Sequence, residues 1–167
     1  MLNLLAGGIL FLISAYIGLA VKRHFEKRRD FFKDAVEFVD TLTDEVSFLK
    51  TPLPQIIQRF GVDKKGDFRD ALLTYAEHIG SGKSTEFQPL SQALKLSRLT
   101  DGERDIMLSF LAGLGKTDAK TQLAALKNYR ARLESFREES QKKFKTTGLL
   151  AYKLGILVGI AIMIIVA

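Results

Sequence analysis

The sequence predicts an all-α protein: a six-helix bundle whose long first and last helices extend into N- and C-terminal transmembrane spans. Three observations support this prediction. Each end of the chain is apolar over about twenty residues, the length that a helix needs to cross the hydrocarbon core of a bilayer. Between the ends, apolar residues recur at steps of three and four, the spacing of amphipathic helices. A cluster of basic residues adjoins each apolar end, so the ends and the middle are expected to lie in different solvents.

The chain has 167 residues, which is room for one domain. We predict a transmembrane helix at residues 1–21, a cytoplasmic helical bundle domain at residues 22–145 and a transmembrane helix at residues 146–167. Lys153 lies close to the start of the second span, where a lysine can bury its aliphatic stem and keep its ammonium group at the interface. The chain contains no cysteine, which excludes disulfides, thiolate metal sites and a cysteine nucleophile.

The first apolar stretch, Leu2–Val21, carries no charge and is followed by a basic cluster. The cluster consists of Lys22, Arg23, Lys27, Arg28 and Arg29. An alternative interpretation is a secretory signal peptide, for which Gly18-Leu19-Ala20 would fit the cleavage site. However, a signal peptide carries its positive charge before the apolar stretch rather than after it. We therefore expect an uncleaved membrane anchor.

The second basic cluster precedes the last apolar stretch and comprises Arg137, Lys142, Lys143 and Lys145. Positively charged flanks stay on the cytoplasmic side of a membrane. Both clusters therefore place residues 22–145 in the cytoplasm and both termini outside, as a two-span hairpin in the cell membrane. Each basic side chain near an anionic bilayer also contributes about 1 kcal/mol of attraction. We expect the lipid bilayer, and no nucleic acid, to be the partner of these clusters, because no nucleic-acid-binding motif is present.

The first helix is expected to continue beyond the membrane to about Leu49, because its apolar residues keep helical spacing. Thr51 and Pro52 suit the N-cap and the first position of a second, short helix that ends near Gly61. A third helix is predicted from Asp67 to Ile79, closing at Gly80, and a fourth from about Phe87 to Ser97.

Thr100 and Glu103 fit a capping box that starts a fifth helix, which Gly115 ends as a left-handed cap. Thr117 is predicted to cap the final helix, with Asp118 in its first turn. From there we expect one continuous or slightly bent helix that runs through Gly148 into the last span.

Two short sequences, Gly80–Ser84 and Gly113–Thr117, end in Gly-Lys-Ser or Gly-Lys-Thr, as a phosphate-binding loop does. The full pattern needs an earlier glycine and a preceding strand, but Glu77 and Phe110 occupy the glycine positions, and helices are expected before both sequences. A membrane-tethered nucleotide-binding or regulatory protein is therefore the disfavoured alternative, and no cofactor is expected.

No set of residues in the chain is typical of a catalytic or metal site. The two histidines have no evident third metal ligand. The carboxylates Asp40, Asp44 and Glu45 are interpreted as one solvated helix face rather than as an acid–base group. We therefore do not expect an enzyme.

Two motifs resemble the stage III sporulation protein AB family of endospore-forming bacteria. The first is Glu45-Val46-Ser47-Phe48-Leu49-Lys50-Thr51-Pro52-Leu53. The second is Leu99-x-x-Gly102-Glu103, then Phe110, then Leu114-Gly115-x-x-Asp118-x-x-x-Gln122. The resemblance extends over essentially the whole chain, including both terminal apolar segments.

The resemblance implies a scaffold in a sporulation complex. The cytoplasmic part of this family is similar to the helical domains of the platform proteins of type II secretion and type IV pilus machines. The resemblance also implies a place in the mother-cell membrane around the forespore, within a transenvelope channel complex. It further implies contact with a companion secretion-type ATPase and other stage III channel subunits.

Two roles are open for the motif residues: folding or partner binding. The motif residues of this chain are Glu45, Thr51, Pro52, Leu53, Gly102, Glu103, Leu114, Gly115, Asp118 and Gln122. Thr51, Pro52, Gly102, Glu103, Gly115 and Asp118 have expected roles at helix ends that require no partner.

Overall fold

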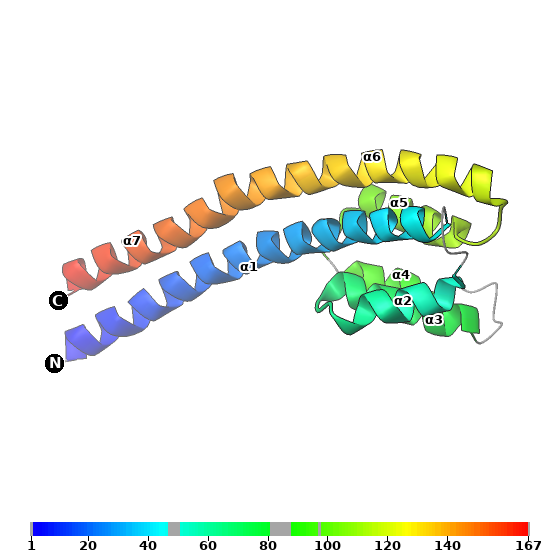
Figure 1. Cartoon of the computed structure of the whole chain (residues 1–167). Helices are drawn as coiled ribbons and strands as arrows, with labels where there is room; N and C mark the ends of the chain where they lie inside the picture. Colours follow the sequence, from blue (N-terminus) through cyan, green and yellow to red (C-terminus); the bar gives the residue numbers. More distant parts are fainter. Residues whose placement is uncertain (1, 47–50, 81–87, 97, 167) are drawn as a thin grey trace. The chain divides into compact units, whose positions relative to one another are not determined.

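The computed structural model describes residues 2–46, 51–80, 88–96 and 98–166, and its regular structure is helical (Figure 1). The elements are α1 (Leu2–Asp44), α2 (Leu53–Val62), α3 (Asp67–Gly80), α4 (Gln88–Leu96), α5 (Asp101–Gly113), α6 (Ala119–Lys143), the π-helical segment η2 (Phe144–Gly148) and α7 (Leu149–Val166). Because α6, η2 and α7 follow one another without interruption, they form one long helix. The all-α prediction is confirmed, with six helices in the described part of the chain.

Two compact units make up the chain. Unit 1 combines residues 1–29 with residues 139–167, and unit 2 is formed by residues 30–138. α1 contributes its first part to unit 1 and its second part to unit 2, and α6 also contributes to both.

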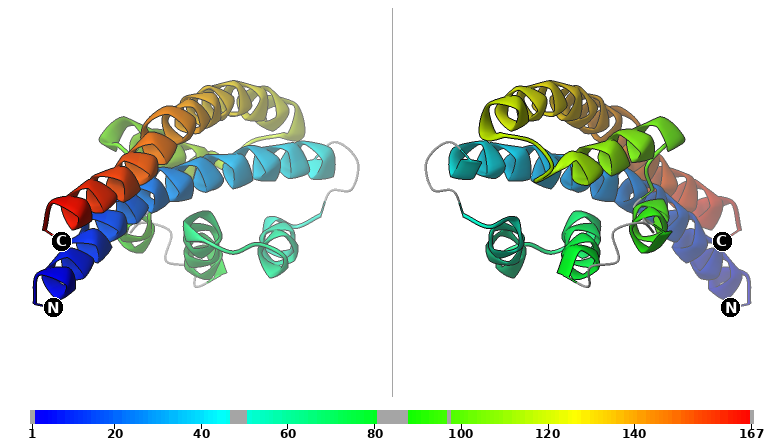
Figure 2. Two further views of the ribbon diagram at one scale, coloured as in Figure 1. Left: turned by 90° about the vertical axis from the view of Figure 1, so that its left-hand side faces the viewer. Right: turned by 90° about the vertical axis from the view of Figure 1, so that its right-hand side faces the viewer.

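In unit 1 the first part of α1 and α7 lie side by side and antiparallel, with the two chain ends together (Figures 1 and 2). Glycines allow the two backbones to come very close. A Cβ atom added to Gly18 would lie 2.8 Å from the Ala151 carbonyl oxygen, and one added to Gly155 would lie 2.9 Å from the Ser14 carbonyl oxygen. The Ser14 hydroxyl donates a hydrogen bond to the Gly155 carbonyl oxygen at 2.8 Å. Small residues and interhelical hydrogen bonds are the means by which helices associate in lipid.

The outer surface of this helix pair is apolar. Its exposed large side chains include Leu5, Ile9, Leu12, Ile17, Leu150, Leu157, Ile160 and Ile164. Two helical stretches, Leu5–Asp44 and Ala119–Val166, are long and apolar enough to cross a membrane by length and composition. Both predicted spans are thus present as helices suited to a bilayer.

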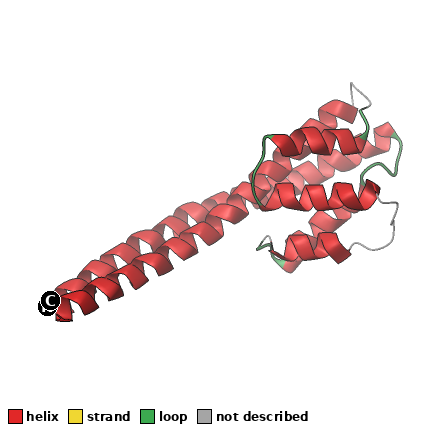
Figure 3. Cartoon of the chain, turned by 90° about the horizontal axis from the view of Figure 1, so that it is seen from below, coloured by secondary structure: helices red, strands yellow, loops and turns green. Residues whose placement is uncertain are grey.

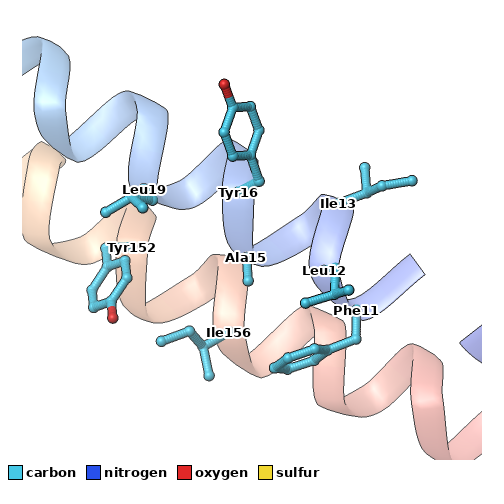
Figure 4. A pocket seen from close by; sticks show the side chains of 8 residues that line it. All are labelled: Phe11, Leu12, Ile13, Ala15, Tyr16, Leu19, Tyr152 and Ile156. Atoms are coloured by element: carbon cyan, nitrogen blue, oxygen red, sulfur yellow. The ribbon is translucent and has the colours of Figure 1, made fainter. Parts of the chain in front are cut away.

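A groove along this surface is also apolar. It is lined by Phe11, Leu12, Ile13, Ala15, Tyr16, Leu19, Tyr152 and Ile156 (Figure 4). Figure 4 shows the rings of Tyr16 and Tyr152 pointing away from each other. None of these side chains is charged.

The predicted continuity through Gly148 is confirmed, with a π-helical segment at the junction. π-Helical turns are rare and occur mostly as local bulges inside α-helices. Here Gly148 lies against Phe25 of α1, and a Cβ atom added to it would lie 3.3 Å from the Phe25 Cβ. The Arg29 guanidinium covers the Phe144 ring at 4.2 Å from the ring centroid.

Unit 2 is built around the second part of α1. Figure 3 shows its shorter helices lying beside the second part of α1. The largest fully buried side chains are Phe31, Phe32, Phe38, Phe68, Phe110, Leu42, Ile57, Leu72, Leu90, Leu94, Met107 and Leu111. Phe38 makes edge-on contacts with Phe60, Phe68 and Phe110, so one residue of α1 joins α2, α3 and α5. Each fully buried apolar side chain of this size contributes about 1.5–3 kcal/mol to folding.

Several predicted helix ends differ from the observed ones. α3 includes Gly80 as its last residue instead of stopping before it. The predicted end of the first helix at Leu49, and both the start at Phe87 and the end at Ser97 of the fourth, lie outside the described residues. α2 begins one residue later than predicted, at Leu53.

The glycine contact in unit 1 predicts how single added methyl groups affect stability. Gly155→Ala is expected to destabilise the detergent-solubilised protein by about 1–3 kcal/mol, because the new Cβ atom meets backbone atoms of α1. Gly8→Ala is the matched control, because a Cβ atom there meets nothing within 4 Å. Thermal unfolding followed by circular dichroism measures both. Equal midpoints for the two variants would show that α1 and α7 do not pack in this way.

Candidate functional site

Residues of both family motifs meet at one end of unit 2. There α1 ends, α2 begins and the turn between α5 and α6 lies (Figure 1). The Leu53 Cδ2 atom lies 3.9 Å from the position that a Cβ atom of Gly115 would occupy, so the two motifs are in contact. We call this the motif end of unit 2. Its residues are Glu45, Thr51, Pro52, Leu53, Leu114, Gly115, Asp118 and Gln122.

Glu45 is a buried anchor at the motif end, with 5% of its surface exposed. The Thr51 hydroxyl donates a hydrogen bond to its Oε2 atom at 2.7 Å, and the Arg59 guanidinium of α2 pairs with its Oε1 atom. The carboxylate therefore ties the end of α1 to α2. The interpretation of this residue as part of a solvated face is wrong, because Thr51 and Arg59 fold back over it.

Thr51 does not cap α2, contrary to the prediction. Pro52 holds the N-cap position in an extended conformation, and no side chain caps the helix. Pro54, at the second helical position, has no N–H group for a cap to bind. The Thr51 hydroxyl is bonded to the buried Glu45 carboxylate instead.

The capping box of α5 is confirmed. The Thr100 N–H group donates to Glu103 Oε2 at 2.9 Å, and the Glu103 N–H group donates to Thr100 Oγ1 at 3.4 Å. Glu103 is buried, so this motif residue serves the fold of the chain itself. A Cβ atom added to Gly102 meets nothing within 4 Å, and nothing in the structure explains a glycine there.

The turn between α5 and α6 joins two helix caps. Gly115 has φ = +74°, which confirms the predicted left-handed cap. Asp118 rather than Thr117 caps α6, because its Oδ2 atom accepts from the Thr121 N–H group at 3.1 Å and its carbonyl accepts from Gln122. Hydrogen bonds from the Thr121 side chain and backbone lower the pKa of Asp118. Its carboxylate is therefore charged at neutral pH, next to the positive end of the helix dipole.

The structure gives no support for nucleotide binding by the two sequences that end like a phosphate-binding loop, Gly80–Ser84 and Gly113–Thr117. The Gly113–Thr117 sequence follows α5 and forms a turn between two helices. Ser81–Ser84 of the other sequence lie outside the described residues. Among the residues whose positions are described, no group of three or more histidine or carboxylate side chains could hold a metal ion.

A hollow of about 160 Å³ lies between α5 and α6 at the motif end. It is lined by Phe110, Gly113, Leu114, Thr117, Thr121, Gln122, Ala125, Leu126 and Tyr129. Phe110 and Leu126 are 1% and 2% exposed and form its floor. Two motif residues, Leu114 and Gln122, are thus part of its wall.

The acidic residues of α1 in unit 2 hold the surrounding elements. Lys64 Nζ lies 2.7 Å from Glu37 Oε2 and 3.7 Å from Asp34 Oδ1. Arg130 of α6 binds Asp40 with two hydrogen bonds, of 2.5 and 3.2 Å. The sequence alone does not reveal these pairs, because no local pattern relates Asp40 to a residue ninety positions away.

Burial raises the pKa of Asp34, although the Lys64 charge opposes this effect. Burial also lowers the pKa of Lys64, but hydrogen bonding to Glu37 and the charge of Asp34 outweigh that effect, and the net shift is upward. Lys64 therefore stays protonated at neutral pH and holds both carboxylates.

The charge of the chain is divided unevenly between the units. Unit 1 contains nine basic and two acidic residues, whereas unit 2 contains 16 basic and 17 acidic residues. The whole excess of positive charge therefore lies in the unit that carries the apolar helix pair.

Some residues of the two basic clusters are packed against other residues of unit 1. Arg28 is buried, with its Nη2 atom 3.7 Å from Glu139 Oε1, and Lys143 Nζ lies 2.7 Å from the same oxygen. The hydrogen bond from Lys143, together with the charges of Lys143 and Arg28, lowers the pKa of Glu139. The Lys22 ammonium lies 5.3 Å from the centroid of the Tyr152 ring. The remaining exposed members of the clusters in unit 1 are Arg23, Lys27, Lys142 and Lys145.

The two threonines near the α5 and α6 starts are expected to differ in their effect on folding. Thr100→Ala should lower the free energy of unfolding by about 1 kcal/mol, because it removes the cap of α5. Thr117→Ala should change it by less than about 0.5 kcal/mol, because Asp118 caps α6. Urea unfolding of the detergent-solubilised protein measures both. A loss of unfolding free energy larger than about 0.5 kcal/mol for Thr117→Ala would show that Thr117 caps α6.

Comparison with known proteins supports the assignment made from the motifs. A sequence model of the family described as stage III sporulation protein AB matches residues 3–167. Neither the search of curated proteins nor that of solved structures finds a match. Since the family match covers nearly the entire chain, this protein belongs to the stage III sporulation protein AB family, a family of sporulation proteins.

Proposed function

We propose that this protein is a membrane-anchored, non-catalytic scaffold of the sporulation channel between mother cell and forespore. It crosses the mother-cell membrane twice, with both termini outside and the helical bundle in the cytoplasm. The bundle docks a secretion-type ATPase and other channel subunits at the membrane. The family match supports the sporulation role, and the features below support the scaffold.

The observation that carries the proposal is the position of the charge. All of the excess positive charge lies in unit 1. Its basic residues other than Lys153 directly follow the first apolar stretch or directly precede the last one, so in the sequence they lie next to unit 2. Basic flanks are retained in the cytoplasm. The near-neutral unit 2 lies between the two basic flanks in the sequence and is therefore on the cytoplasmic side as well.

The antiparallel packing of α1 and α7 supports the same topology. Two helices in close contact through Gly18 and Gly155 can lie in one bilayer only with both chain ends on one side. The chain between them then returns to the opposite side. A hairpin of this kind holds a domain at the membrane surface without needing a further anchor.

The motif residues favour a scaffold over an enzyme. Glu45, Glu103, Gly115 and Asp118 serve helix ends and helix contacts within the chain. Leu114 and Gln122 line a hollow that is open to a partner. Residues with these roles stabilise a helical bundle and leave a surface that a partner protein can bind. None of the observations favours nucleotide binding by this chain.

ATPase localisation tests the proposal. In sporulating cells that contain the full chain, the companion ATPase is expected in the membrane fraction. In cells whose chain has α2 to α5 replaced by a short flexible linker, it should move to the soluble fraction, because the docking bundle is lost. Immunoblots of both fractions measure the change, with the variant Ile164→Val as a control for membrane insertion.

An ATPase that stays in the membrane fraction without the bundle would contradict the scaffold function. The linker variant must itself be recovered in the membrane fraction, which separates loss of docking from loss of the anchor.

A further inference from the structure

The hollow at the motif end has the form of a socket for one apolar side chain. Its floor is formed by the buried side chains of Phe110 and Leu126, and Tyr129 packs against Phe110 with ring centroids 5.3 Å apart. Thr117 and Thr121 lie at its exposed edge. In protein interfaces, the side chains that dominate the binding energy fill well-packed pockets that the partner covers.

Two cations flank the hollow. Lys116 directly precedes Thr117 of the rim, and Arg132 lies one turn beyond Tyr129 on α6. Both side chains are exposed, and the described part of the chain provides neither with an ion pair. From the start of α6 to Arg132 the helix rises about 20 Å, so the two cations lie at opposite ends of the hollow.

The turn before α6 and the first half of α6 are basic, although unit 2 as a whole is nearly neutral. Between residues 116 and 133 the basic residues are Lys116, Lys120, Lys127, Arg130 and Arg132. The single acidic residue there is Asp118, whose carboxylate is bonded to the start of α6. Arg130 is bound to Asp40. Lys120 and Lys127 lie on the opposite side of α6 from the hollow, as helical spacing requires.

We infer that the hollow binds an apolar side chain from an acidic segment of a partner protein, whose carboxylates pair with Lys116 and Arg132. Charge complementarity selects this partner, because an apolar hollow between two exposed cations that have no ion pair within the described residues matches an apolar residue between acidic ones. The inference rests on the proposed scaffold function and adds the docking face and the chemistry of the docked segment.

A nucleic acid is a poorer occupant of this surface. Single-stranded nucleic acids bind aromatic rings that are free to stack, but the Tyr129 ring is packed against Phe110, and Phe110 is buried. The hollow also offers a side-chain-sized socket rather than a groove that follows a phosphate backbone.

Photo-crosslinking in sporulating cells tests the inference with the full chain. A photoreactive amino acid at Ala125 lies in the hollow, and one at the exposed neighbour Ala124 is the matched control. The expected result is a protein adduct at Ala125 alone, whose crosslinked peptide, identified by mass spectrometry, has net negative charge and an apolar residue at the crosslink.

Charge reversal tests the role of the flanking cations. Lys116→Glu combined with Arg132→Glu is expected to reduce the Ala125 adduct about tenfold, and lysines in place of the acidic residues of the captured peptide should restore it. Lys120→Glu combined with Lys127→Glu changes the net charge equally on the other side of α6 and should leave the yield unchanged. Equal thermal midpoints of both variants show that the fold is kept.

Four results would overturn the inference: no Ala125 adduct above the Ala124 control, a lipid or nucleic-acid adduct, a captured peptide without acidic residues, or an equal loss for both charge reversals. If the ATPase still depends on the protein for membrane retention in that case, the scaffold function stands and its docking face lies elsewhere.

Discussion

The close backbone contact between α1 and α7 is the constraint on which the packing of unit 1 depends. Lipid gives no hydrophobic drive for two apolar helices to associate, so contact must come from packing and hydrogen bonds. Gly18 and Gly155 allow that packing, and the Ser14 hydroxyl adds a hydrogen bond to the Gly155 carbonyl oxygen. This contact makes an antiparallel pair of two segments that are more than a hundred residues apart in the chain.

α1 meets two different requirements along its length. Its first part exposes apolar side chains, whereas its second part buries them against α2, α3 and α5 and uses its acidic residues to bind cations from neighbouring elements. The motif residues other than Gly102 and Glu103 lie where this second part ends. Several of them hold helix ends in place, whereas Leu114 and Gln122 line the hollow between α5 and α6.

Features that depend on neighbouring residues could be predicted from the sequence, whereas contacts between residues far apart in the chain could not. The apolar stripe of α1, the Thr100–Glu103 capping box and the left-handed Gly115 follow from neighbouring residues alone. Local patterns predict Thr51 and Thr117 as caps, but Thr51 binds a buried carboxylate and Asp118 caps α6 in place of Thr117. The Arg130–Asp40 pair and the hollow depend on how helices pack, which no local pattern encodes.

Cysteine accessibility tests the central claim, a cytoplasmic bundle held between two spans, most directly. The chain has no cysteine, so a single introduced one labels a single place. Lys65→Cys lies at an exposed position in the bundle, and a cysteine appended to either terminus reports the ends. In intact protoplasts, a membrane-impermeant maleimide should label both termini and should label Lys65→Cys only after permeabilisation. Labelling of Lys65→Cys in intact protoplasts, or of one terminus alone, would contradict the hairpin.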